Sequence, residues 1–301
     1  MKKTRIIFVG NYKGGVGKTT TVLNLAHLFS DGGKDVLVID IDPQSSLSEI
    51  ISSNNIDGVP LRRLCDRETL NYLFDLYIKK ISEYPTLDLN FNTSIVKKYR
   101  DKFYYVPSSL FYMNDRGLDS ICLDMSDGID YLTIFKKIVD NINLDNKYDI
   151  IIIDCPPSNN LITQSAFLMS DFYIIPTIMD RVSSNGVVHY IKTIDNIYKK
   201  YCEEDNDAIL YRNIFQNKPE LMGIFYTLKR GQVNYDIAKT EFENSVKEYF
   251  KDENNALTNK ILKTEINNYI DIARSTETGM PTPKNDYQEL FAEMKQKYDW
   301  I

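Results

Sequence analysis

The chain has 301 residues, of which 42 are acidic and 36 are basic, so its formal net charge is −6. No apolar run approaches the length of a membrane-spanning helix, and the first predicted strand begins too early to leave room for a signal peptide. The four cysteines are scattered without a C-x-x-C pair, which indicates neither a disulfide framework nor a metal site. We therefore expect a cytoplasmic protein.

The first predicted element is a short buried strand, residues 5–9, followed by the glycine-rich stretch GNYKGGVGKTTT. Apolar residues at helical spacing then predict a helix that ends at Gly32 and Gly33. Strand, glycine loop and helix in this order are typical of a P-loop, where backbone N–H groups and the helix N-terminus bind phosphate. Lys18 is expected to reach the β- and γ-phosphates, and Thr19 to ligate Mg²⁺. The predicted nucleotide-binding residues are Lys13, Gly14, Gly15, Val16, Gly17, Lys18, Thr19 and Thr20.

The loop departs from the standard P-loop pattern in two ways. Tyr12 stands where the pattern begins with glycine, and a second lysine, Lys13, precedes Lys18. The stretch resembles KGGxGK[ST], the deviant Walker A motif of the ParA/MinD class of ATPases. This resemblance implies that Lys13 reaches across an ATP-sandwich homodimer to the phosphates of the other subunit, which would couple nucleotide state to dimerisation. The alternative for Lys13 is a solvated loop lysine.

The second predicted strand, residues 35–40, runs into the acidic stretch DIDPQ. Carboxylates at the C-terminal end of a parallel strand face the crevice in which α/β sheets bind ligands. The stretch resembles the Walker A′ segment of the same family. The resemblance implies that Asp40 helps to hold the Mg²⁺ shell and that Asp42 orients the attacking water. Alone, such residues could equally form a turn or a helix cap. The predicted catalytic residues are Lys13, Lys18 and Asp42.

Residues 46–102 are longer than a tight connection and are predicted to form a helical elaboration on the same fold. A strand at 103–109 and a helix at about 128–143 follow. The stretch YDIIIIDCPPS then predicts a strand buried on both faces, with Asp154 at its end in a Walker B arrangement. The CPPS segment resembles ParA proteins more closely than MinD-type relatives. The predicted metal-binding residues are Thr19, Asp40 and Asp154.

The rest of the chain alternates between strands and helices, and residues 202–220 look like an acidic surface excursion. Such alternation predicts an α/β fold, with a mostly parallel twisted sheet and helices on both faces. We expect one P-loop domain over residues 1–301. The P-loop begins within the first strand, so no N-terminal helix-turn-helix domain is expected. The predicted strands are at 171–178, 221–228 and 260–266, and the next helix is at about 184–201.

The three motifs together resemble ParA-type DNA-partition ATPases. The resemblance implies ATP hydrolysis with Mg²⁺, a ParB-like centromere-binding adaptor that stimulates it, and non-specific DNA binding that would associate the ATP-bound dimer with the nucleoid. A net charge of −6 and a pI near 5.2 oppose DNA binding. Asn268 and Asp271 also stand where many relatives carry arginines. The candidate DNA-contacting residues are Lys192, Lys199, Lys200, Lys229, Arg230 and Arg274.

Several alternatives remain open. A MinD-like ATPase needs a C-terminal amphipathic helix rich in Lys and Arg, whereas acidic side chains here offset the basic ones around an apolar stripe of Leu290, Phe291 and Met294. We therefore expect no membrane partner. A ligase of the same superfamily would typically lack the signature lysine, and an iron–sulfur reductase would need cluster cysteines. A positioning ATPase whose cargo is not DNA is a further alternative.

Overall fold

The computed structural model describes residues 3–55, 58–86, 89, 95–143, 146–179, 181–231, 235–249, 260–282 and 284–301. The chain forms an eight-stranded sheet at its centre. The strands are β1 (Arg5–Val9), β2 (Val36–Asp40), β3 (Lys97–Arg100), β4 (Phe103–Val106), β5 (Ile150–Asp154), β6 (Phe172–Ile178), β7 (Glu220–Lys229) and β8 (Ile261–Asn267).

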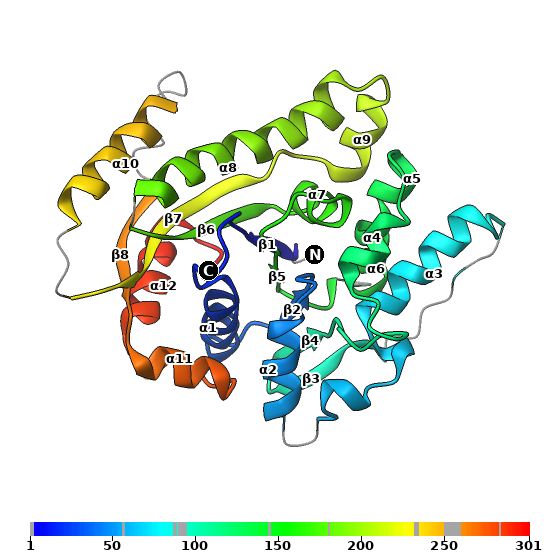
Figure 1. Cartoon of the computed structure of the whole chain (residues 1–301), viewed down its shortest axis with the longest axis horizontal. Helices are drawn as coiled ribbons and strands as arrows, with labels where there is room; N and C mark the ends of the chain where they lie inside the picture. Colours follow the sequence, from blue (N-terminus) through cyan, green and yellow to red (C-terminus); the bar gives the residue numbers. More distant parts are fainter. Residues whose placement is uncertain are drawn as a thin grey trace.

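The strand order across the sheet is β3-β4-β2-β5-β1-β6-β7-β8. Only β3 pairs antiparallel, with β4, and the other described pairings are parallel. Helices cover both faces of the sheet (Figure 1). This architecture confirms the predicted α/β fold with a mostly parallel sheet.

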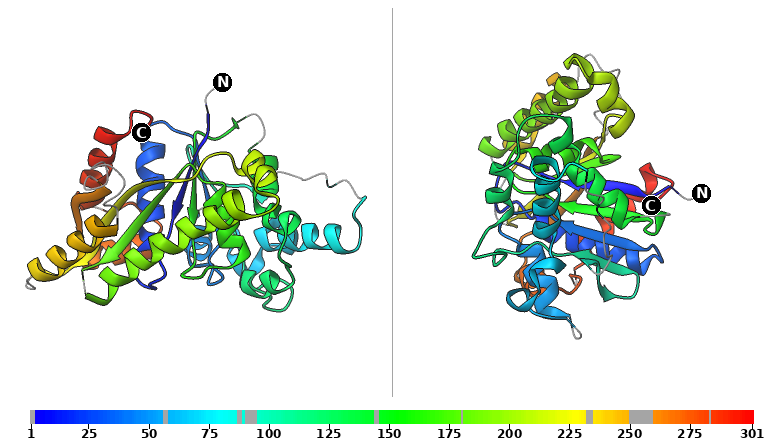
Figure 2. Two further views of the ribbon diagram at one scale, coloured as in Figure 1. Left: turned by 90° about the horizontal axis from the view of Figure 1, so that it is seen from above. Right: turned by 90° about the vertical axis from the view of Figure 1, so that its right-hand side faces the viewer.

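The described helices vary from one turn to five turns in length. They are α1 (Lys18–Asp31), α2 (Ser46–Asn54), α3 (Leu70–Ser82), α4 (Leu118–Leu123), α5 (Ile129–Leu132), α6 (Ile134–Ile142), α7 (Leu161–Leu168), α8 (Arg181–Lys199), α9 (Ala208–Phe215), α10 (Asp236–Tyr249), α11 (Ile270–Glu277) and α12 (Asp286–Lys297). Figure 2 shows α3 extending away from one end of the sheet, and both chain ends on the same side of the molecule.

Two apolar cores lie on opposite faces of the sheet because successive strand residues point to opposite sides. In β1, Ile7 and Val9 belong to the core beneath α1 and α12, whereas Phe8 belongs to the core beneath α3, α6, α7 and α8. All five residues of β5 are buried. Burial on both faces explains why the central strands read as continuous apolar runs rather than alternating ones.

The register brings the ends of three strands together. Val9 of β1 and Asp40 of β2 both lie opposite Asp154 of β5. The connection after β1 leads to β2 on one side of β1, whereas the connection after β5 leads to β6 on the other side. The adjacent strands β1 and β5 therefore mark a topological switch point, and the crevice at the carboxyl ends of such strands is where α/β sheets bind ligands. The loops that follow β1, β2 and β5 therefore converge at one edge.

Three predicted segments differ in detail from the structure. The elaboration at 46–102 contains α2 and α3 but also the edge strand β3, whose sequence KKYR is polar because a sheet edge faces solvent. The helix expected at 128–143 is interrupted at Thr133, where α5 ends and α6 begins. The excursion at 202–220 contains α9, which buries Tyr211 and Phe215.

Candidate nucleotide-binding site

The glycine loop between β1 and α1 adopts a backbone that side chains would hinder. Gly15 and Gly17 have φ values of +70° and +81°, in the left-handed region that glycine adopts without steric cost. Gly17 is the N-cap of α1, and no side chain caps the helix there. The first N–H groups of a helix have no acceptor within the helix, so this end is suited to bind an anion such as phosphate.

Tyr12, the residue in place of the first P-loop glycine, is directed to a helix rather than to the loop interior. Its ring packs edge-on against Tyr190 of α8, with 4.7 Å between the ring centroids. Tyr190 also explains why position 10 is a glycine, because a Cβ at Gly10 would lie only 2.0 Å from the Tyr190 hydroxyl oxygen. The departure from the standard pattern therefore anchors the loop to α8.

Lys18 is 7% exposed, and its Nζ donates to the Lys13 carbonyl oxygen at 3.2 Å. Its ammonium thus lies against the loop itself. Burial lowers the pKa of Lys18, and the carboxylates of Asp154 and Asp42 act in the opposite direction. Lys13 is half-buried at the start of the loop. A buried cation beside backbone donors is the arrangement that a polyphosphate needs.

Thr19 and Asp154 meet across the loop edge. The Thr19 hydroxyl donates to Asp154 Oδ2 at 2.7 Å. Asp154 is 1% exposed, and its Oδ1 has no hydrogen-bond partner among the described residues. Burial, followed by the charge of Asp40, raises the pKa of Asp154 well above its usual range. A buried carboxylate oxygen without a donor fits a bound cation or a water in its shell, so these residues fit Mg²⁺.

Asp40 is held more firmly than Asp154. Its Oδ2 accepts from the backbone N–H and the hydroxyl of Ser48, at 2.8 and 2.7 Å, and its Oδ1 accepts from Asp42 N at 3.1 Å. Burial raises the pKa of Asp40 to about 7. Asp42 is half-buried, and its Oδ1 accepts from Gln44 N at 2.9 Å. Asp40 is therefore fixed in place, while Asp42 lies closer to solvent.

Sequence reasoning missed three side chains that shape this site. Ser48 orients Asp40, and its only signal in the sequence is its position shortly after DIDPQ. Asn11 ties the loop to β6, because its Nδ2 donates to Pro176 O at 2.9 Å and its Oδ1 accepts from Lys13 N at 3.0 Å. Thr227 contacts the loop from β7 and gave no local signal.

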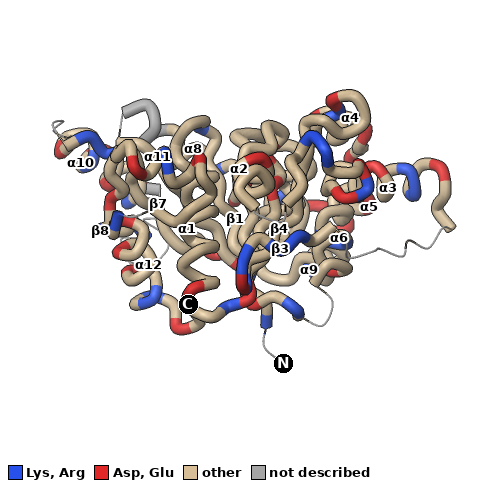
Figure 3. Tube along the Cα trace, turned by 90° about the horizontal axis from the view of Figure 1, so that it is seen from below, with Lys and Arg blue, Asp and Glu red and all other residues tan. Residues whose placement is uncertain are grey.

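The candidate DNA-contacting residues do not form one patch. Lys199 ends α8 and Lys200 follows it, so both lie near the amino-terminal edge of the sheet. Lys229 and Arg230 instead lie at the carboxyl edge, where β7 ends. Arg274 is exposed on α11, and Lys192 is exposed along α8. Figure 3 shows basic and acidic residues interspersed along the chain trace.

Several of these cations already contact anionic or aromatic groups. Lys229 forms an ion pair with Glu265 of β8, which also binds Lys239 at 3.0 Å. Lys199 pairs with Glu204 at 3.1 Å, and the Lys200 ammonium lies over the Tyr201 ring, 4.5 Å from its centroid. Among the six candidates, Arg230 and Arg274 are the two exposed arginines.

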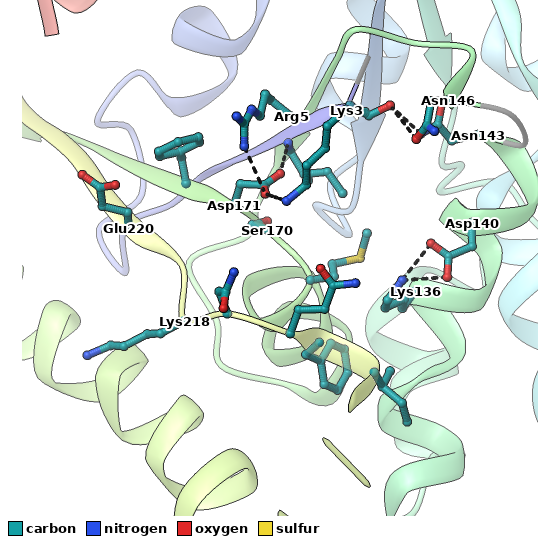
Figure 4. A pocket seen from close by; sticks show the side chains of 18 residues that line it. Lys3, Arg5, Lys136, Asp140, Asn143, Asn146, Ser170, Asp171, Lys218 and Glu220 are labelled. Carbon is teal, nitrogen blue, oxygen red and sulfur yellow. Dashed lines mark hydrogen bonds and ion pairs between the residues drawn. The ribbon is translucent and has the colours of Figure 1, made fainter. Parts of the chain in front are cut away.

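A separate pocket of about 400 Å³ lies at the amino-terminal edge of the sheet, away from the loop (Figure 4). Asp171 in its wall binds Lys3 at 3.0 Å and accepts from Ile6 N at 3.0 Å. Lys136 and Asp140 pair with one another at 2.7 Å on another wall. The pocket's charges thus offset each other, and its described lining residues include none from the glycine loop.

The C-terminal helix uses its apolar stripe inside the protein. Leu290, Phe291 and Met294 are buried, and the Phe291 ring packs edge-on against Phe29 of α1 with 4.9 Å between centroids. None of the described helices combines the length and apolarity that crossing a bilayer requires. Among the described residues, no group of three or more His, Cys, Asp or Glu side chains is placed to hold a metal ion by itself.

A protein-family model described as an AAA domain matches residues 4–207. The chain is 24% identical to the chromosome partitioning protein ParA of Caulobacter vibrioides over 237 residues. This match covers 78% of this chain and 74% of that protein. It is 25% identical over 290 residues to the sporulation initiation inhibitor protein Soj of Bacillus subtilis, covering 96% and 94% of the two chains.

Solved structures with the same fold include a protein from Borrelia burgdorferi B31 described as a plasmid partition protein and bound to AMPPNP. It has a TM-score of 0.66 and 21% identity over 98% of each chain. Apo McdA from Cyanothece has a TM-score of 0.67 and 18% identity over 97% of each chain. MinD from Pyrococcus horikoshii, complexed with Mg-ADP, has a TM-score of 0.62 and 18% identity, with 98% and 96% of the chains covered.

Proposed function

The chain belongs to the AAA-domain family, and we propose that it is a dimerising ATPase that segregates plasmid or chromosomal DNA with a centromere-binding adaptor. The observation that carries the proposal is the contact between Thr19 and Asp154, next to the buried Lys18 and Asp40. Relatives named ParA and Soj, and neighbours bound to AMPPNP and Mg-ADP, support ATP and Mg²⁺ as the ligands.

Each residue of the site has a distinct proposed role. The loop amides from Gly14 to Thr20 and the Lys18 ammonium bind the phosphates, and Thr19 with Asp154 holds Mg²⁺, which neutralises charge on the β- and γ-phosphates. Asp40, fixed by Ser48, supports the magnesium shell. Asp42 orients the attacking water.

Dimerisation and hydrolysis are linked through Lys13 in this proposal. Lys13 acts across the dimer, so the closed state requires a triphosphate in each subunit. Hydrolysis, which the adaptor would accelerate, then releases the dimer. The ATP-bound dimer is expected on the nucleoid, where its exposed cations contact DNA phosphates.

Non-specific duplex DNA and anionic liposomes provide the test. With ATP and Mg²⁺, the protein should retard DNA with an affinity that falls steeply as salt rises, since each neutralised phosphate contributes about 0.9 to the salt slope. It should not float with liposomes, because the apolar stripe of α12 is buried. Capture by liposomes without DNA binding would favour a MinD-like role. Absence of both, with ATP-dependent dimerisation intact, would favour a cargo other than DNA.

A pair of double variants locates the DNA surface. Lys229→Ala with Arg230→Ala should lower the salt slope by about 1 to 2 while leaving ATP affinity unchanged. Lys79→Ala with Lys80→Ala removes the same charge from α3, which extends from the other end of the sheet (Figure 1). This control should bind DNA like the parent, and an equal loss in both variants would place the surface elsewhere.

A further inference from the structure

Thr227, near the end of β7, lies against the phosphate loop. Its hydroxyl oxygen is 2.9 Å from Val16 O and 3.0 Å from Thr177 O, and the residue is 2% exposed. Its methyl carbon is also the atom nearest to the place where a Cβ would stand at Gly17, at 3.8 Å. A hydroxyl has one proton, so Thr227 donates to one of the two carbonyls at a time. The contact joins the loop to β6 and β7.

The direction of the Val16 carbonyl fixes the direction of the next N–H. In a trans peptide, a carbonyl and the N–H of the following residue point in opposite directions, and the described chain has no cis peptide bond. The Val16 carbonyl is turned toward the buried Thr227 hydroxyl. The Gly17 N–H therefore points away from Thr227, as one of the loop amides that a P-loop presents to phosphate.

We propose that Thr227 is a positioning residue for nucleotide binding, whose hydroxyl holds the Val16–Gly17 peptide with its N–H aimed at the phosphate before nucleotide arrives. This inference rests on the proposed ATP-binding function. When a phosphate accepts from Gly17 N–H, the carbonyl of the same peptide becomes a stronger acceptor, so the two hydrogen bonds reinforce each other. Nucleotide binding thus draws the Thr227 proton to Val16 and away from Thr177.

Two variants that differ only in the hydroxyl test this role. Thr227→Ala should raise the Kd of a fluorescent ATP analogue about fivefold to tenfold, which corresponds to about 1 to 1.4 kcal/mol. Thr227→Ser keeps the hydroxyl and should bind within about twofold of the parent. In Thr227→Ala, the Kd of ADP should rise by the same factor as that of ATP, because the loop amides bind the α- and β-phosphates that both nucleotides carry. In steady-state hydrolysis, KM should rise by a larger factor than kcat falls.

Thr4→Val is the matched control for a merely structural effect. Thr4 is also buried, and its hydroxyl donates to Tyr148 O at 2.6 Å, at the opposite edge of the sheet. Both Thr4→Val and Thr227→Ala should lower the melting temperature, but only Thr227→Ala should weaken nucleotide binding. If the parent binds ATP and Thr227→Ala binds it equally well, the proposed positioning role of Thr227 is wrong, while the proposed function stands. If the parent protein fails to bind ATP with Mg²⁺, the proposed function itself is wrong.

Discussion

Thr19 and Asp154 are 135 positions apart in the chain, yet their side chains lie 2.7 Å from each other. The contact exists because the glycine loop joins β1 to the start of α1, and β5 is the neighbour of β1 in the sheet. Three carboxylates, of Asp40, Asp42 and Asp154, share this edge with one buried ammonium. Burial and the charges of the neighbouring carboxylates raise the pKa of Asp40 and of Asp154, and at Asp154 the Lys18 ammonium opposes this only in part. Bound Mg²⁺ would supply further positive charge.

Lys18→Ala is expected to abolish nucleotide binding, raising the Kd of a fluorescent ATP analogue at least about 100-fold, because it removes the buried cation from the phosphate site. Equilibrium titration with the analogue measures the effect. Lys98→Ala, an exposed lysine on β3 that pairs with Asp101, is the matched control and should bind like the parent. Parent-like affinity in Lys18→Ala would mean that the loop is not the nucleotide site.

At the scale of elements, α1 is bound on its outer side by the C-terminal part of the chain. Asn24 Oδ1 accepts from Thr282 N at 3.0 Å, and His27 Nε2 donates to Gly279 O at 2.8 Å. His27 is 1% exposed, and its Nδ1 has no hydrogen-bond partner in the part of the chain that the structure describes. Burial therefore keeps this histidine neutral and lowers its pKa to about 4.

This junction predicts a pH-dependent stability. Unfolded His27 takes up a proton near its ordinary pKa of 6.5, and folded His27 does so only near 4, so stability is lost as pH falls between these values. Between pH 7 and pH 5 the contribution is about 2 kcal/mol. His27→Gln keeps an N–H donor for Gly279 but does not titrate, so its stability should fall less over this range.

Urea unfolding at pH 7 and pH 5 measures the difference. His189→Gln, at an exposed histidine of α8, is the control and should retain the parent's pH dependence. The same loss of stability in His27→Gln and the parent would show that His27 titrates normally in the folded protein.

At the scale of the whole molecule, Lys13 and Asp42 separate the steps of the proposed cycle. Lys13→Ala should bind ATP as a monomer, because Lys18, Thr19 and the loop amides remain, but the closed dimer and hydrolysis should be lost. Asp42→Ala should form an ATP dimer that persists, because the water is no longer oriented. Size-exclusion chromatography with light scattering, in ATP and Mg²⁺, distinguishes these outcomes. Parent-like dimerisation and hydrolysis by Lys13→Ala would show that Lys13 does not act across the dimer.

Features that are contiguous in the chain were predictable without the folded structure. A loop of consecutive residues shows its glycines, its lysines and the flanking strand and helix together, so GNYKGGVGKTTT predicted the phosphate site, and the family and the fold class are confirmed. The isoleucine run of β5 likewise predicted a strand buried on both faces. Helix breaks, such as that at Thr133, depend on packing and were not visible in the apolar spacing.

Contacts between distant side chains depend on how the chain folds. Thr227 is 211 positions from Val16 and carries no local signal, because hydrogen bonding across the sheet depends on strand order. In the same way, the sequence made Lys229 a candidate DNA contact, and the structure pairs it with Glu265 on the neighbouring strand. Local sequence specifies the backbone of the glycine loop, the proposed phosphate site. The order of the strands specifies which carboxylates, hydroxyls and counter-charges surround it.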